Sequence, residues 1–297
     1  MTTTAQLPTS QRPVHTVIRG KGFHWVGDGF RVTQLFPAGA DLGDLISPFL
    51  LLDYHAPFDY EPTDRPRGVG VHPHRGFETV TLAFSGSVAH HDSSGGGGVI
   101  HPGDVQWMTA ASGILHKEYH EAEWAKSGGR FHMAQLWVNL PADRKMDPPR
   151  YQALTAESIG EVDLPNDAGV VRVVAGDYDG HRGPADTATR IDLWELQLNG
   201  SAPVELAVPA KQNLALLVHE GTATINGTTA NQGDLVVLDR QEGSVIIDVA
   251  EPARLLVLSG EPIDEPVVSY GPFVMNSREQ ILEAIQDFES GKFGHLA

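Results

Sequence analysis

Apolar residues recur along the chain in short runs that glycine, proline or aspartate separates. Across residues 14–36 apolar and polar positions alternate, which is the pattern of strands with one buried face. The step Asp28-Gly29 within this stretch predicts a hairpin. Residues 48–54 are largely apolar, which predicts a strand buried on both faces.

The same rhythm continues through the middle of the first half. Residues 79–84 read as a strand, and Gly86 marks a turn after it. The Pro-Gly-Asp sequence at residues 102–104 predicts a tight turn before the next apolar run, residues 105–108. Strand and turn in regular succession are typical of a small antiparallel barrel, and the fold class expected is all-β.

The second half repeats the first in outline. Residues 214–225 resemble residues 80–89, and the Gly-Asp turn at residue 234 corresponds to the one at residue 104. An offset of about 130 residues is that of a barrel-sized repeat. Prolines between residues 141 and 150 break regular structure and suggest the link between barrels. We therefore expect two domains, residues 1–145 and 146–297.

One helix is predicted, near the C-terminus, over residues 276–288. Asn276 or Ser277 can cap its first turn. The helical period places four apolar residues on one face, which predicts packing onto a barrel. These residues are Ile281, Leu282, Ile285 and Phe288.

Four potential metal ligands form two i, i+2 pairs, His72/His74 and His116/Glu118. Residues two apart on a strand point to the same face, so each pair can direct both donors at one point. Three imidazoles and one carboxylate suit a divalent transition metal better than calcium or magnesium. No such pair recurs in the second half, where His219 and Glu220 are adjacent. We therefore predict one ion per chain, in the first barrel.

Two further histidines, His90 and His91, precede a glycine-rich stretch at residues 95–98. They could join the metal site, but the interpretation adopted is a solvated turn between two strands. The glycines do not form a phosphate loop, because no Lys-Ser or Lys-Thr follows them.

Five longer motifs resemble the pirin family of the cupin superfamily. They occur at residues 72–80 (HPHRGFETV), 102–110 (PGDVQWMTA), 113–116 (GILH), 135–140 (QLWVNL) and 270–276 (YGPFVMN). The resemblance implies two cupin barrels (double-stranded β-helices, or jelly rolls) in tandem, a metal-free second barrel, and a C-terminal helix that returns to the first. It assigns the metal to His72, His74, His116 and Glu118.

The resemblance also implies an activity, because the family includes quercetin 2,3-dioxygenases. A mononuclear Fe(II) suits a mixed shell of imidazole and carboxylate with open positions, and Ni, Mn, Cu or Zn could occupy it too. The expected substrates are a flavonol-like aromatic molecule and O2, with Glu118 as catalytic base. Other cupins take their carboxylate from the position of Glu78, which we expect to face inward and to orient an imidazole instead.

A flat aromatic substrate would need an apolar lining, for which the expected residues are Phe77, Trp107, Met108, Ile114 and Leu115.

The alternative function is a metal-dependent regulator that binds a transcription factor or metabolic enzyme. An isomerase or hydrolase on a cupin scaffold fits the motifs less closely.

Charge and composition limit the classes of binding partner that we expect for this protein. Lys and Arg number 21 against 38 Asp and Glu, a formal net charge of -17, which disfavours direct binding to nucleic acid or anionic membranes. The absence of cysteine excludes disulfides and thiolate ligands, and it fits a reducing cytoplasm. The N-terminus resembles no signal peptide, and no apolar run could span a bilayer. The expected location is cytoplasmic.

Overall fold

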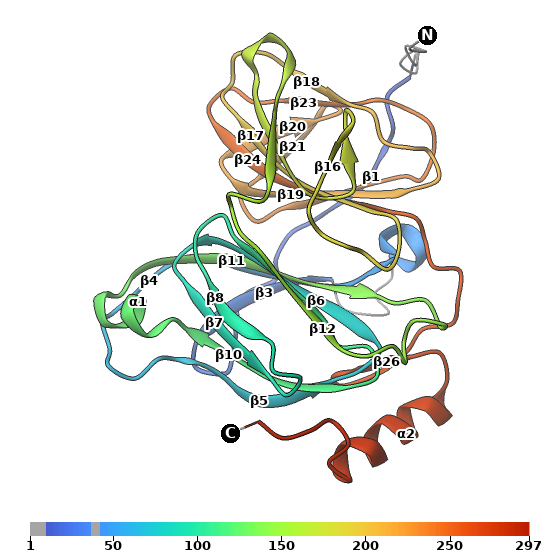
Figure 1. The fold of residues 1–297 in the computed structure, drawn as a ribbon. Coiled ribbons are helices and arrows are strands. Elements are labelled where there is room, and N and C mark those ends of the chain that lie inside the picture. Colours follow the sequence, from blue (N-terminus) through green and yellow to red (C-terminus); the bar gives the residue numbers. More distant parts are fainter. Residues whose placement is uncertain (1–9, 37–41, 297) are drawn as a thin grey trace. The chain divides into compact units, whose positions relative to one another are not determined.

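Strands make up most of the protein, as a computed structural model shows for residues 10–36 and 42–296 (Figure 1). The chain divides into two compact units. The first unit comprises the described residues of Gly20–Asp41, Pro48–Ser158 and Ile263–Ala297. The second comprises those of Met1–Arg19, Leu42–Ser47 and Ile159–Pro262.

The first unit is built from two antiparallel sheets, as the alternating pattern predicts. One has seven strands in the order β12-β9-β6-β11-β4-β3-β2, and the other has four in the order β5-β10-β7-β8. The bounds are β2 His24–Val26, β3 Phe30–Phe36, β4 Phe49–Tyr60, β5 Gly68–His74, β6 Phe77–Ser85, β7 Val88–Asp92, β8 Gly97–Ile100, β9 Val105–Thr109, β10 Ile114–His120, α1 Ala122–Ser127, β11 Gly129–Asn139 and β12 Arg150–Leu154.

Both sheets of this unit share one apolar core. Phe30 and Phe131 from the seven-stranded sheet pack with Val88 and Ile100 from the four-stranded sheet. Long strands such as β4 and β11 pair along most of their length, so that the sheet holds its side chains in a fixed register. The predicted hairpin at Asp28-Gly29 is confirmed, because Val26 pairs with Phe30.

The division into units departs from the boundary expected at residue 145. Strand β12 follows the proline-rich segment but pairs with β9, and so belongs to the first unit. Strand β1, Val14–Ile18, pairs with β22 of the second unit instead of joining the strands that follow it. The pairings of β12 with β9 and of β1 with β22 join segments that are far apart in the sequence. The positions of proline and glycine mark where strands end but do not show which strands pair.

The second unit repeats the two-sheet plan. Its sheets have the orders β1-β22-β19-β24-β17-β14-β13 and β18-β23-β20-β21, around a core of Val, Leu and Ile. The bounds are η1 Gly43–Ile46, β13 Gly160–Asp163, η2 Pro165–Asp167, β14 Gly169–Ala175, β15 Asp177–Tyr178, β16 His181–Arg182, β17 Ile191–Leu198, β18 Val204–Leu206, β19 Asn213–Glu220, β20 Thr222–Ile225, β21 Thr228–Asn231, β22 Leu235–Leu238, β23 Val245–Asp248 and β24 Ala253–Gly260.

The C-terminal segment forms a hairpin, β25 Val268–Tyr270 with β26 Phe273–Met275, and then the helix α2, Arg278–Glu289 (Figure 1). Ser277 caps the helix by accepting a hydrogen bond from the backbone N–H of Gln280. Ile281 packs on Phe273 in the first unit, but Leu282 is 60% exposed and Phe288 39% exposed. The predicted apolar face was therefore too wide. Within the described residues, no helix is long and apolar enough to cross a membrane.

A buried ionic group in the second unit leads to a prediction about stability and pH. Arg172, Glu195 and His219 are each less than 9% exposed, and the side chains of Arg172 and His219 both contact the Glu195 carboxylate. Burial alone would raise the pKa of Glu195, but hydrogen bonding to His219 and the charges of His219 and Arg172 outweigh it and lower that pKa to about 2.

Because the folded-state pKa of Glu195 is depressed, its stabilisation is present above pH 4.5 and is lost as pH falls towards 2. That stabilisation is about 3 kcal/mol. We expect Glu195→Gln to lower the free energy of unfolding by this order at pH 7 and to flatten its decline between pH 4.5 and 2. Urea unfolding across this range measures both effects. Glu205→Gln, on the exposed face of β18, is the control. An unchanged slope in Glu195→Gln would show that other groups govern acid unfolding.

Candidate metal centre

Strands β5 and β10 bring three of the four predicted ligands together. Their antiparallel register places His116 opposite His72 and Ile114 opposite His74. The three imidazole rings lie 4.2 to 4.9 Å apart between centroids. One nitrogen of each ring lies within 4.8 Å of the others, so that the group could hold a metal ion.

Glu118 lies beside His116 but belongs to a second, overlapping group, with His90 and His116. A register shift between His116 and Glu118 separates the carboxylate from the β5 histidines. Its Oε1 accepts hydrogen bonds from Thr81 Oγ1 and Gln106 Nε2, both at 3.2 Å, and its Oε2 accepts one from Gln135 Nε2 at 2.7 Å. The structure therefore holds Glu118 firmly, within reach of His116.

The three histidines present the lone pairs that a metal requires. His74 Nδ1 and His116 Nε2 are buried and have no hydrogen-bond partner within residues 10–36 and 42–296. His72 Nδ1 donates to the Gly70 carbonyl at 2.8 Å, which leaves Nε2 to bind an ion. A buried nitrogen without a partner costs about 1–3 kcal/mol, and an ion would remove that cost. Burial, followed by neighbouring histidine charges, holds the pKa of His74 and His116 well below the ordinary value. Both rings are therefore neutral, the form that binds metals.

The prediction that His90 lies in a solvated turn was wrong. Strand β7 continues through Asp92, so adjacent histidines alternate between its two faces. His90 is fully buried and lies 3.4 Å from His116 between their Nδ1 atoms, whereas His91 is exposed and stacks on Tyr119. Regular alternation in Val-Ala-His-His-Asp was the sequence signal that could have placed one histidine inside.

Two protein-family models match the chain. A model named Pirin covers residues 29–138, and one for the pirin C-terminal cupin domain covers residues 193–294. The chain belongs to the pirin family. The resemblance drawn from its motifs is thereby confirmed, as is the expectation of two cupin domains.

Individual relatives cover nearly all of this pirin. A protein of Pseudomonas aeruginosa named "Putative quercetin 2,3-dioxygenase" is 52% identical over 91% of this chain and 94% of its own. A pirin-like protein of Caulobacter vibrioides is 37% identical over 95% of this chain and 99% of its own. The crystal structure of a quercetin 2,3-dioxygenase from Acinetobacter baumannii is 44% identical, with a TM-score of 0.92 over 97% of this chain and 100% of that one.

Glu78 does not face the histidines of this pirin, contrary to expectation. It lies three residues from Thr81, an odd offset along β6, and Thr81 contacts Glu118. Glu78 instead accepts a hydrogen bond from Thr109 Oγ1 at 2.6 Å, and within the described residues no hydrogen bond joins it to an imidazole. Burial raises the pKa of Glu78 to about 7, although the bond from Thr109 acts in the opposite direction.

The predicted apolar lining is only partly correct. The Phe77 ring lies 5.1 Å from that of His74, and Met108 packs with Ile114. Trp107 lies on the face of β9 opposite to Gln106, which contacts Glu118, and Leu115 packs on the C-terminal segment.

Sequence reasoning missed three side chains around the histidines and Glu118. Trp137, half-buried, lies 5.3 Å from His74 and 4.3 Å from Phe77 between ring centroids, and Gln106 and Gln135 hold Glu118. Polar or amphipathic residues at alternate positions of otherwise apolar strands were the signal available for all three.

Proposed function

We propose that this pirin is a metal-dependent dioxygenase that opens the ring of a quercetin-like flavonol with O2. The observation that carries the proposal is the group of three imidazoles beside a buried carboxylate. Two of the imidazole nitrogens, His74 Nδ1 and His116 Nε2, are buried and have no hydrogen-bond partner among the described residues. Similarity to the quercetin 2,3-dioxygenase of Acinetobacter baumannii and to the Pseudomonas relative supports the choice of substrate.

His72, His74, His116 and Glu118 would hold one divalent ion, which we propose to be Fe(II). Mixed imidazole and carboxylate ligands suit non-haem iron. When bound, the ion supplies Lewis acidity and open positions for the substrate and O2. Four protein ligands leave those positions open on a five- or six-coordinate ion, unlike a closed structural site.

Glu118 is the group that would accept the proton of the flavonol hydroxyl. Its Oε1 already accepts two hydrogen bonds, whereas Oε2 accepts one, from Gln135. The proton is therefore expected at Oε2. The two glutamine amides and Thr81 fix the direction of the carboxylate, so that little reorganisation is needed when the proton moves.

Aromatic side chains offer a surface for a flat substrate next to the histidines. Phe77 and Trp137 pack with an interplanar angle of 31°, and Trp137 is half-buried. The Trp137 ring is thus partly accessible to a ligand, and it packs against the buried ring of Phe77. A flavonol ring stacked on Trp137 would lie beside His74, with which the indole is in edge contact.

Oxygen uptake tests this proposal directly. The protein loaded with Fe(II) under anaerobic conditions and then given quercetin and air should consume one O2 per flavonol and release one carbon monoxide. Separate loading with Ni, Mn, Cu and Zn tests the choice of ion. If the protein binds Fe(II) but consumes no O2 with any flavonol, the enzyme proposal fails and a role in binding a protein partner is favoured.

A further inference from the structure

We infer that Asp92 and His90 are positioning residues that set the tautomer of His116, so that its Nε2 presents a bare lone pair to the proposed metal site. The inference rests on the proposed function only in taking His116 as a metal ligand. It does not depend on which substrate the protein uses.

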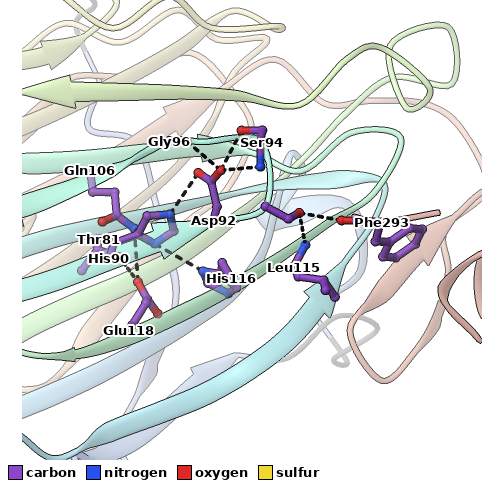
Figure 2. A network of polar contacts seen from close by, with 11 residues as sticks. Thr81, His90, Asp92, Ser94, Gly96, Gln106, Leu115, His116, Glu118 and Phe293 are labelled. Atoms are coloured by element: carbon purple, nitrogen blue, oxygen red, sulfur yellow. Dashed lines mark hydrogen bonds and ion pairs between the residues drawn. The ribbon is translucent and has the colours of Figure 1, made fainter. Parts of the chain in front are cut away.

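The three side chains form a continuous buried line, which Figure 2 shows from Asp92 to His116. Asp92 Oδ2 lies 3.3 Å from His90 Nε2, and His90 Nδ1 lies 3.4 Å from His116 Nδ1. His90 and His116 are fully buried and Asp92 is 4% exposed. Since solvent cannot supply alternative partners, the protons along this line must be shared among these groups.

The positions of the protons follow from the groups at the two ends of His90. A carboxylate only accepts, so His90 carries a proton on Nε2, facing Asp92. His90 Nδ1 is then an acceptor, which agrees with the Gln106 amide nitrogen at 3.1 Å. That nitrogen also donates to Glu118 Oε1, which fixes the orientation of the amide.

His116 must therefore carry its own proton on Nδ1, because it faces an acceptor there. Two bare nitrogens at this distance would repel, and two N–H groups would clash. The remaining nitrogen, His116 Nε2, is left unprotonated, and it is buried with no hydrogen-bond partner among the described residues. The contacts from Asp92 through His90 to His116 thus explain why His116 Nε2 carries a lone pair that a metal could bind.

The hairpin turn after β7 keeps Asp92 ionised and in place (Figure 2). Its Oδ1 accepts hydrogen bonds from the backbone N–H groups of Ser94 and Gly96 and from the Ser94 hydroxyl, at 2.6 to 2.9 Å. Burial would raise the pKa of Asp92, but these bonds and the one to His90 lower it to about 2. A side chain at position 96 would begin 2.4 Å from Asp92 Oδ2, so glycine is needed there.

The C-terminal segment in turn holds this hairpin. Ser93 Oγ donates to the Phe293 carbonyl at 2.5 Å and accepts a hydrogen bond from the Leu115 N–H at 3.0 Å. Leu115 adjoins His116 on β10. Asp92 already pairs with His116 across β7 and β10, and the Ser93 N–H donates to the Leu115 carbonyl. The Ser93 hydroxyl adds a link from this pair of strands to the C-terminal segment, which limits their relative movement.

The primary test is the tautomer of His116 in metal-free protein, read from side-chain ¹⁵N chemical shifts. We expect the wild type to carry the proton on Nδ1. In Asp92→Asn the new amide can donate to His90 Nε2, which moves the His90 proton to Nδ1 and the His116 proton to Nε2. Finding the His116 proton on Nε2 in the wild type would overturn the inference without any variant.

Metal affinity is the second readout, measured by titrating Co(II) into metal-free protein. Loss of a group that orients a ligand typically weakens binding ~10–100-fold. We expect that loss in Asp92→Asn, and also in His90→Gln, with the unfolding midpoint of the metal-free protein within a few degrees of wild type. Asp59→Asn, an exposed aspartate paired with Arg130, is the control and should bind Co(II) as wild type does.

Two outcomes would contradict the inference. One is unchanged Co(II) affinity in both variants. The other is weaker binding accompanied by an equal loss of stability and an unaltered His116 tautomer, which would indicate a purely structural role. These readouts need no flavonol, so a protein that binds metal but does not oxidise quercetin would refute the proposed function and leave this inference standing.

Discussion

Replacing His116 by alanine is expected to abolish metal binding and flavonol turnover while leaving the protein folded. His116 is shared by both groups of candidate ligands, and its Nε2 is buried with no hydrogen-bond partner in the part of the chain that the structure describes. Removing a direct ligand should cost more than the ~10–100-fold typical of residues behind the ligands. Both units keep their own apolar cores, so the fold should survive.

Metal analysis after dialysis, together with circular dichroism, measures this effect. His91→Ala is the matched control, because His91 is an exposed histidine next to the site and stacks only on Tyr119 among the described rings. It should retain one ion per chain. Full metal occupancy in a folded His116→Ala protein would show that the ligand assignment is wrong.

Glu118→Gln is expected to lower turnover by ~10²–10⁴-fold, the usual contribution of a general base, with the metal still bound. The substitution preserves the size of the side chain but removes its charge. It also places an NH2 group where Gln106 and Gln135 now donate, so one of these amides must rotate or lose its acceptor. Steady-state oxygen uptake at saturating quercetin, with metal content measured on the same sample, gives the comparison.

Glu78→Gln is the control for that prediction. Glu78 is also a buried glutamate of the first unit, but its side chain lies on the other face of β6, where it accepts a hydrogen bond from Thr109 of β9. It should retain near wild-type turnover. If Glu118→Gln keeps both its metal and its turnover, Glu118 is not the base.

The ligand pairs were predictable from sequence because the geometry that defines them is local. His72 and His74, like His116 and Glu118, need only an extended backbone to share a face. What the pattern could not supply was the register between strands. The shift between His116 and Glu118 on β10, and the pairing of Glu118 with His90, depend on how separate strands align.

Failures of the prediction have the same origin. His90 was assigned to a turn because glycines follow it, yet the turn begins only after Asp92. Glu78 was assigned to the wrong face of β6 because alternation shows which residues share a face but not which face points to the histidines. The contact between Thr81 and Glu118 identifies that face, and Glu78 lies on the other one. The pairing of β1 with β22 joins residues more than 200 positions apart and left no signal in either segment.

An anomalous difference map of crystals of the metal-loaded protein, collected at the absorption edge of the ion, tests the central claim most directly. The account predicts one peak per chain, bonded to nitrogens of His72, His74 and His116 and to an oxygen of Glu118 at about 2.0–2.2 Å. His90 should lie outside that shell, with its nitrogens on Asp92 and His116. A peak bonded to His90 in place of the β5 histidines, or a second peak in the other unit, would contradict it.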